Sequence, residues 1–356
     1  MLSILERYIG MTVLRTSLLS LAVLTGLSSL IRFVEQLKSV GRGSYEVVDA
    51  ALFVFYSLPR DIEVFFPMAA LLGGLIGMGM LASNSELVVM MAAGRSRLNI
   101  AAAVMKTAII MMVAVMAIGE WIAPPMEAKG RLIRAQEISG GSLISAQRGV
   151  WAKDGNRFIN IGEVQDTGQL NSVLIYEFTE QKQLDTVTYA QSAVFSDQKW
   201  RLNQVVVTEI GERRINERRV PSMAWQSSLT PDKLGVVTVK PESLSITGLL
   251  DYLTYLESNQ QSSQRYELAL WRKVLAPITV AVMLLVALSF IFGPLRSTSM
   301  GARILLGVVT GFGFHVTNEI FGPLAQVYQI PAILGAVLPS IVFAGLAVYF
   351  MQKRPG

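Results

Sequence analysis

Residues 275–292 read LAPITVAVMLLVALSFIF and hold no charged side chain. The hydrocarbon core of a bilayer is about 30 Å thick, so roughly 20 mostly apolar residues in a helix are enough to cross it. With the partly apolar residues before it, the run covers Leu268–Phe292 and predicts a membrane-spanning helix. The stretch indicates that the protein resides in a membrane.

Five further segments have the same character and predict five more spans. They are about Met11–Ile31, Val54–Leu81, Ile100–Ala123, Ile304–Ile320 and Ile330–Met351. The composition agrees, because 52% of the 356 residues are hydrophobic and only 16% are charged, where a soluble domain carries about a quarter. The N-terminal MLSILERYIG has no small-residue cleavage site, so we expect a short amphipathic lead-in to a retained helix rather than a signal peptide.

The insert between the third and fourth spans, from Pro124 to about Glu267, alternates apolar and polar residues as half-buried strands do. The expected strands are Arg157–Ile161, Asn171–Phe178, Asp185–Phe195 and Lys199–Val207. Turn signals such as Asp154-Gly155-Asn156 separate them. The pattern predicts an antiparallel, jellyroll-like all-β domain, followed by a helical segment near residues 245–256. The expected division is residues 1–124 with three membrane helices, 125–267 with the β-domain and its connecting helix, and 268–356 with three more.

The orientation follows from the basic residues that flank the spans, because Lys and Arg favour the cytoplasmic side. The residues on that side are Arg7, Arg95, Arg97, Arg296, Arg303, Lys353 and Arg354. The connection at residues 322–329 on the other side has no Lys or Arg. Both termini are therefore expected in the cytoplasm and the β-domain outside. The net charge of +5 then needs no nucleic-acid partner.

The segment SELVVMMAAGRSR, residues 85–97, lies between two spans and is too short to cross the bilayer. Ser85 is expected to cap a short helix over about residues 85–94, and Glu86 complements the helix dipole. Gly94 and Arg95 are expected to mark its end. A short cytoplasmic helix with an apolar face suits a groove on another protein. The alternative is a helix that lies on the inner leaflet.

A second basic cluster lies on the outer side, where topology gives no reason for it. Its members are Arg32, Lys38, Arg42, Arg60, Arg131 and Arg134. Arg131 and Arg134 share a helix face if the third helix continues past Pro124 and Pro125. One interpretation is a cationic rim that binds phosphates above an apolar cavity. The other is that these side chains reach lipid headgroups or pair with Glu35, Asp61 and Glu63.

The sequence excludes several kinds of chemistry. There is no cysteine, and His315 is the only histidine, so disulfides, cysteine nucleophiles and most zinc sites are excluded. No G-x-x-x-x-G-K-[ST] loop is present, so the chain has no phosphate loop for ATP hydrolysis. We therefore expect no catalytic residues, no metal site and no cofactor in this chain. Any energy for transport has to come from a separate protein.

Several motifs resemble the LptF/LptG lipopolysaccharide export permeases, and most closely the G type of that family. They are RYIG (7–10), FFPMAALLG (65–73), SELVVM (85–90), GEW-x-AP (119–124), WAKDGN (151–156), LTPDKLGVV (229–237) and ALSFIFGPLRS-x-x-MG-x-R (287–303). The motifs occur in family order along nearly the whole chain. The resemblance implies a Gram-negative inner-membrane protein with six helices divided by a periplasmic jellyroll.

The resemblance also implies the partners and the cargo. They are an LptF-type paralogue, a dimer of the LptB-type ATPase that binds ATP and Mg, the periplasmic bridge of LptC and then LptA, and lipopolysaccharide. The family's coupling helix matches Ser85, Glu86, Leu87 and the residues up to Arg95. Its lipopolysaccharide-binding positions match Arg32, Lys38, Arg60, Arg131 and Arg134, with acyl chains expected at Phe65 and Phe66. Arg32 and Arg60 stand where G-type sequences are expected to have Lys.

Two other functions stay open at this point. A mechanotransmitting subunit would also use a separate ATPase to move a periplasmic domain, but it would carry no lipid. A membrane-anchored scaffold would only tether the β-domain and would need no coupling helix. Co-purification with an ATPase and with a lipid separates the three.

Overall fold

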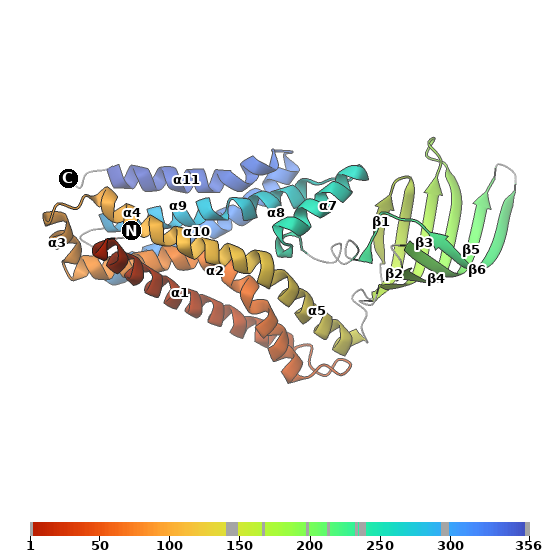
Figure 1. Ribbon diagram of the computed structural model, residues 1–356, viewed down its shortest axis with the longest axis horizontal. Coiled ribbons are helices and arrows are strands. Elements are labelled where there is room, and N and C mark those ends of the chain that lie inside the picture. The colour runs from red at the N-terminus through yellow and green to blue at the C-terminus, as the bar shows by residue number, and fades with distance from the viewer. Residues whose placement is uncertain are drawn as a thin grey trace. The chain divides into compact units, whose positions relative to one another are not determined.

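The computed structural model describes residues 3–139, 149–165, 168–196, 199–211, 214–231, 234, 240–292 and 299–352. The chain divides into two compact units. The first comprises Met1–Arg32, Ser57–Pro124 and Gln264–Gly356, and the second comprises Phe33–Tyr56 and Pro125–Ser263. Each unit is built differently: the first is helical, and the second contains a β-sheet (Figure 1).

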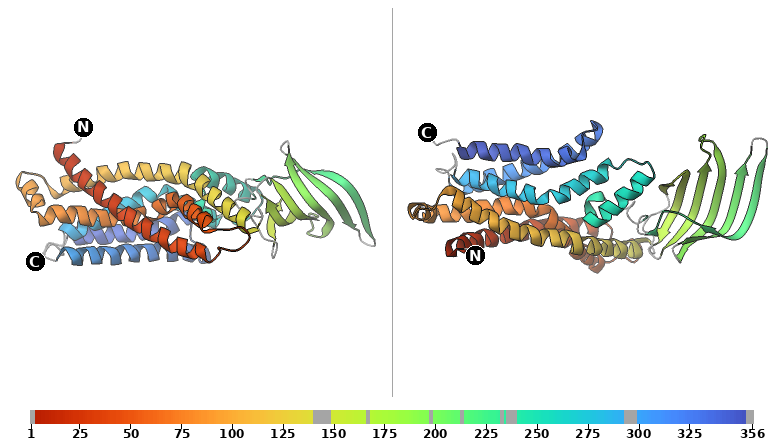
Figure 2. Two further views of the ribbon diagram at one scale, coloured as in Figure 1. Left: turned by 90° about the horizontal axis from the view of Figure 1, so that it is seen from below. Right: turned by 45° about the horizontal axis from the view of Figure 1, so that its top comes forward.

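Except for the short α3 at one end, the helices that form the first unit or enter it run lengthwise beside one another (Figures 1 and 2). Their bounds are α1 Ile4–Leu37, α2 Val47–Ser83, α3 Glu86–Ala92, α4 Arg97–Ala117, η1 Ile118–Ile122, α8 Gln264–Val274, α9 Ala276–Phe292, α10 Met300–Val327 and α11 Ala332–Gln352. Among the described residues, five helices are long and apolar enough to cross a membrane, and the bent pair α8 and α9 makes a sixth if it counts as one span. This confirms a helical membrane protein.

The span expected over Leu268–Phe292 is bent rather than straight. Its two halves, α8 and α9, meet at an angle of 54° around Leu275. Pro277 explains the break, because proline has no N–H to donate to the carbonyl four residues earlier, and its ring crowds that carbonyl. That carbonyl belongs to Lys273, and regular hydrogen bonding resumes at Leu275, whose carbonyl accepts from the N–H groups of Ile278 and Thr279 at 3.0 and 3.2 Å.

The core of the first unit is a continuous apolar cluster between α1, α2, α4 and α9. Leu71, Leu75 and Met78 of α2 and Leu284 of α9 are fully buried within it. A hydroxyl links two of these helices, since Thr16 donates to the Gly73 carbonyl at 2.6 Å, as polar side chains do between helices in membranes. The outer faces are equally apolar, as the exposed leucines and valines of α1 show. Such faces are stable against lipid or a partner helix and not against water.

One end of the helix bundle gathers three parts that are distant in sequence. Helix α1 begins there, α11 ends there, and α3 lies there (Figures 1 and 2). The sequence predicted that these three parts share one side of the membrane. The structure brings them to one end of the bundle.

The third membrane helix does continue past Pro124 and Pro125. Helix α4 passes through η1, a π-helical turn, directly into α5, Ala123–Ser139. The prolines lie in the first turn of α5, where the lack of an N–H costs least. Because proline removes hydrogen bonds from the preceding turn, the wider π-helical turn forms just before it.

The second unit contains one six-stranded antiparallel sheet. The strands are β1 Val150–Asp154, β2 Arg157–Gln165, β3 Gln169–Phe178, β4 Leu184–Ser196, β5 Lys199–Ile210 and β6 Ile215–Trp225. Each strand pairs with its neighbour in sequence, from β1 to β6. The four expected strands correspond to β2 through β5. The expected β-domain is confirmed, and its described strands follow the simple order of a meander.

The chain after β6 returns to the first strand. Ser227 and Ser228 donate their hydroxyls to Asp154 at the end of β1, at 2.6 and 2.5 Å. Six strands at about 4.8 Å spacing would hold the two edges of a flat sheet roughly 24 Å apart. The contact therefore requires a curved sheet, which Figure 1 shows.

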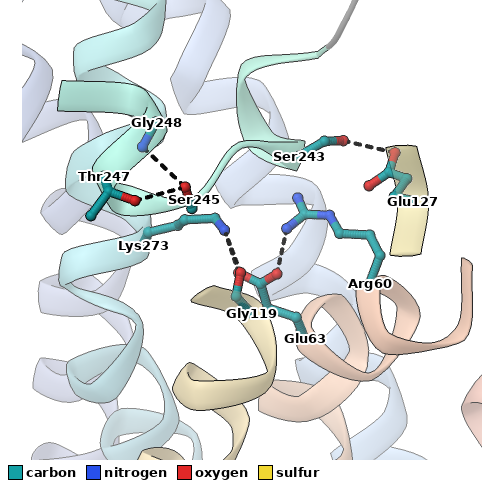
Figure 3. Close-up of polar contacts among 9 residues, drawn as sticks. All are labelled: Arg60, Glu63, Gly119, Glu127, Ser243, Ser245, Thr247, Gly248 and Lys273. Atoms are coloured by element: carbon teal, nitrogen blue, oxygen red, sulfur yellow. Dashed lines mark hydrogen bonds and ion pairs between the residues drawn. The ribbon is translucent and has the colours of Figure 1, made fainter. Parts of the chain in front are cut away.

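A helix and a short 3₁₀ turn complete the second unit. Helix α7, Ile246–Ser258, begins at Ser245, whose hydroxyl accepts from the Gly248 N–H at 3.0 Å. The turn η2, Pro241–Ser243, contacts α5 because Ser243 donates to Glu127 at 3.0 Å (Figure 3). At its other end α7 holds the β1–β2 turn: Tyr255 donates to the Lys153 carbonyl at 2.7 Å.

Candidate functional site

Helix α3 is apolar on two sides, and only one of them packs inside the protein. Leu87 and Met90 are buried in the core of the bundle, at 3% and 7% exposure. Val88 and Val89 point away from it, with 49% and 66% of their surface exposed. The seven-residue helix therefore leaves two valines uncovered beside its charged first residue, Glu86.

The ends of α3 differ in part from the sequence prediction. Ser85 does not cap the helix with its side chain: it adopts the left-handed conformation at φ 62° and makes no side-chain cap hydrogen bond. Its carbonyl accepts the first N–H groups instead. The expected end at Gly94 is confirmed, because Gly94 has φ +89°. The N–H groups of Gly94 and Arg95 donate to the carbonyls of Met91 and Met90, which is the Schellman motif.

Glu86 lies at the start of α3 and connects it to α1. Its carboxylate accepts from the Tyr8 hydroxyl at 2.9 Å and from the Asn84 amide at 3.3 Å. The side chain is thus held in one direction at the edge of the exposed surface. A fixed carboxylate loses less conformational entropy on binding a basic partner than a free one does.

Two of the five predicted phosphate-binding residues lie in the first unit, and both have carboxylate partners. Arg32 binds Asp61 at 2.5 Å. Arg60 binds Glu63 one turn later on α2 at 2.6 Å (Figure 3). These pairs fit the alternative in which basic residues are neutralised within the protein. Asp61 is nearly buried at 4% side-chain exposure, so its charge requires such a partner.

Lys273 on α8 is a third cation of the same region, and the sequence analysis missed it. Its ammonium binds the other oxygen of Glu63 at 3.2 Å and donates to the Gly119 carbonyl at 3.3 Å (Figure 3). The available signal was a lysine inside the expected span Leu268–Phe292, because charges within a span are rare and functional.

The other three predicted phosphate-binding residues belong to the second unit. Lys38 is exposed after the end of α1. Arg131 and Arg134 are three residues apart on α5, and the guanidinium of Arg134 lies over the Phe53 ring, 5.9 Å from its centroid. In the part of the chain that the structure describes, none of the three forms an ion pair.

The two phenylalanines expected to meet acyl chains differ in accessibility. Phe66 is 3% exposed and belongs to the core of the first unit. Phe65 is half-buried and packs against that core from its edge. In this arrangement only Phe65 offers surface to a ligand.

The described residues contain no group of three or more histidine, aspartate or glutamate side chains that could hold a metal ion. The notable features are instead helix α3 with its exposed valines, the ion-paired arginines of the first unit, the cations of the second unit that form no ion pair, and a curved sheet. Together with the apolar bundle they define a multi-pass helical membrane protein with a β-domain inserted between its third and fourth spans.

Comparisons with known proteins agree along nearly the whole chain. Residues 7–353 match the family model described as lipopolysaccharide export system permease LptF/LptG. The chain is 48% identical to the lipopolysaccharide export system permease protein LptG of Escherichia coli K12, over 99% of this chain and 98% of that protein. It is 47% identical to LptG of Haemophilus influenzae, over 99% of both chains.

The chain therefore belongs to the LptF/LptG family of lipopolysaccharide export permeases, and its resemblance to the LptG type is confirmed. As a member of this family it is a non-catalytic permease subunit in the multi-pass inner-membrane part of the Lpt export system.

Proposed function

We propose that the chain extracts lipopolysaccharide from the inner membrane together with an LptF-type paralogue and delivers it to a periplasmic bridge of LptC and LptA. A dimer of an LptB-type ATPase, with its own ATP and Mg, supplies the energy. The β-domain, residues 125–267, lies in the periplasm between two sets of three spans, and both termini are cytoplasmic. Helix α3, the start of α1 and the end of α11 lie at the same end of the helix bundle (Figure 1), which supports this orientation.

Helix α3 is the proposed contact with the ATPase. Its inner side chains, Leu87 and Met90, anchor it in the bundle core, while Val88 and Val89 are exposed. A force on the exposed side is thereby passed to α1, α2 and α4 through packed side chains, because close-packed cores transmit strain. Glu86 and Arg95 at the two ends of α3 add charges that fix the register of docking.

The single observation that carries lipid binding is the set of unpaired cations in the second unit, Lys38, Arg131 and Arg134. A cation that forms no ion pair with a carboxylate among the described residues is available to an anionic ligand. Lipopolysaccharide carries phosphates on its lipid anchor, and an arginine fork binds phosphate bidentately. Arg32 and Arg60 in the first unit each have a carboxylate partner. A phosphate therefore has to share the guanidinium with that carboxylate or displace it.

The experiment reverses the unpaired charges on α5. In the complete complex, a photocrosslinker at position 53, beneath Arg134, captures lipopolysaccharide in cells. The double variant Arg131→Glu with Arg134→Glu is expected to lower capture at least about tenfold, because each charged hydrogen bond contributes roughly 1.5–3 kcal/mol.

Lys129→Glu is the matched control, because Lys129 lies on the same helix with its ammonium over the Tyr56 ring and carries the same charge. Capture close to that of the unmodified protein is expected for this variant. If the double variant also captures lipopolysaccharide normally, Arg131 and Arg134 serve only to reach headgroups at the interface.

A further inference from the structure

The π-helical turn η1 leaves the Gly119 carbonyl without the backbone donor that its hydrogen-bond pattern requires. Within η1 the N–H of Ala123 donates to Ile118, five residues earlier. The Gly119 carbonyl would need the next N–H in the same pattern, but residue 124 is proline, which has none. An unsatisfied carbonyl in a span costs several kcal/mol. Lys273 satisfies it, with its ammonium 3.3 Å from the Gly119 oxygen.

Glu63 occupies the space next to this carbonyl because residue 119 has no side chain. A Cβ at Gly119 would lie 2.7 Å from the Glu63 carboxyl carbon and within 3.0 Å of both of its oxygens. No other amino acid fits there without moving Glu63. The sequence Gly119 to Pro124 thus supplies both the room for the carboxylate and the free carbonyl beside it (Figure 3).

Glu63 uses its two oxygens for different partners. Oε1 binds Lys273 at 3.2 Å, and Oε2 binds Arg60 at 2.6 Å. The side chains are largely buried, with 10% exposure for Lys273, 16% for Arg60 and 19% for Glu63. Glu120 adds a second negative charge to the surroundings of Lys273, so two carboxylates balance the two cations. Three elements, α2, η1 and α8, meet at this carboxylate.

We propose that Glu63 and Lys273 are positioning residues that hold Arg60 for an anionic lipid headgroup. This inference rests on the proposed function, in which Arg60 meets a phosphate of the transported lipid. Glu63 occupies only Nη1 of the Arg60 guanidinium. The remaining donors have no hydrogen-bond partner among the described residues. Lys273 fixes Glu63 from one side, and Glu63 fixes the direction of the free donors of Arg60.

The physical reason is geometric. A guanidinium binds phosphate through two parallel N–H groups, so its plane has to be fixed in advance for full affinity. An arginine on an isolated helix has many rotamers, and ordering it costs conformational entropy. The Glu63–Lys273 pair removes that cost before the lipid arrives.

The test measures lipopolysaccharide retained per complex by mass spectrometry, using the full chain purified with its partners. Glu63→Gln and Lys273→Gln are each expected to lower retention about threefold to tenfold, and Lys273→Arg is expected to preserve it, because a loss of 1.4 kcal/mol is tenfold. Lys106→Gln is the matched control. Lys106 on α4 also forms an ion pair with a glutamate of another helix, Glu6 of α1, at 2.6 Å, and this pair does not include Arg60. Retention in this variant should stay unchanged.

A charge exchange separates positioning from simple clamping. The double variant Glu63→Lys with Lys273→Glu restores an ion pair between α2 and α8 but places an ammonium beside Arg60. We expect the melting temperature to recover relative to the single variants while retention stays low. Retention that recovers together with the melting temperature would show that the pair only clamps the helices and would overturn the proposal.

Arg60→Gln distinguishes this proposal from the function on which it rests. If Arg60→Gln lowers retention while Glu63→Gln and Lys273→Gln do not, the positioning role is wrong and the lipid contact of Arg60 stands. If Arg60→Gln retains as much lipid as the unmodified complex, the lipid contact itself is wrong, and the positioning role falls with it.

Discussion

A substitution at Glu86 tests the proposed coupling to an ATPase most directly. Glu86→Ala removes the carboxylate and should weaken binding of the ATPase at least about tenfold, because losing one partner of a charge pair in an interface costs roughly 2–5 kcal/mol. Affinity of the purified permease for the ATPase, followed by transport in cells, measures the effect. Normal assembly together with normal transport would refute the docking role.

Tyr8→Phe is the informative companion variant. It removes the hydroxyl that donates to Glu86 at 2.9 Å but leaves the charge in place. The expected loss of affinity is smaller than for Glu86→Ala, because the carboxylate becomes mobile rather than absent. Equal losses in the two variants would mean that Glu86 acts within the chain and not on the partner.

At the level of single residues, the sequence located the cations but not their partners. Asp61 and Glu63 were named only as possible ion-pair partners of the basic cluster. Which cation each one binds depends on which side chains the folded helices bring together. The cap expected from Ser85 was wrong because the preceding turn places it in the left-handed conformation. Lys273 was overlooked because its role depends on a carbonyl freed in another helix.

Among the secondary-structure elements, helix α7 gives a pH-dependent prediction. Burial, and then the negative charge of Asp154, raise the pKa of Tyr255 to about 12, from a usual value near 10. The folded state therefore holds the phenol proton more tightly than the unfolded state. The resulting stabilisation is complete below pH 10 and is lost as the pH rises from 10 to 12.

Tyr255→Phe should remove most of that pH dependence. Unfolding of the second unit, followed by tryptophan fluorescence at pH 9 and pH 11, measures it, since Trp200 and Trp225 are buried in the sheet. Tyr189→Phe is the control, because Tyr189 is 39% exposed on β4. An unchanged loss of stability in Tyr255→Phe would assign the effect to another group.

The elements also show what periodicity can and cannot predict. The spans were evident because the hydrocarbon core requires long apolar runs, but α1 and α2 extend beyond the expected ends, where polar residues form further helical turns. Strands β1 and β6 were not expected. Strand β1 is short, and β6 carries Arg218, Arg219 and Pro221, which is typical of an edge strand that needs no apolar alternation.

For the whole molecule, the order of spans and β-domain was predictable from composition alone. The contact that returns the chain to β1 was not, because it joins Asp154 to Ser227 and Ser228, which lie far from it in sequence. The expectation of a jellyroll-like domain was more specific than what the described strands show, which is one curved sheet. The family resemblance supplied the cargo, which no pattern of apolar residues identifies.

The most direct test of the account is transfer of lipopolysaccharide by the complete complex. Proteoliposomes that contain this chain, its paralogue and the ATPase are loaded with lipopolysaccharide, and the lipid reaching a soluble periplasmic acceptor is measured with and without ATP. We predict ATP-dependent transfer that falls strongly in the Arg131→Glu, Arg134→Glu double variant. ATP hydrolysis by an intact complex without any transfer of lipid would contradict the account and would indicate a mechanotransmitting subunit.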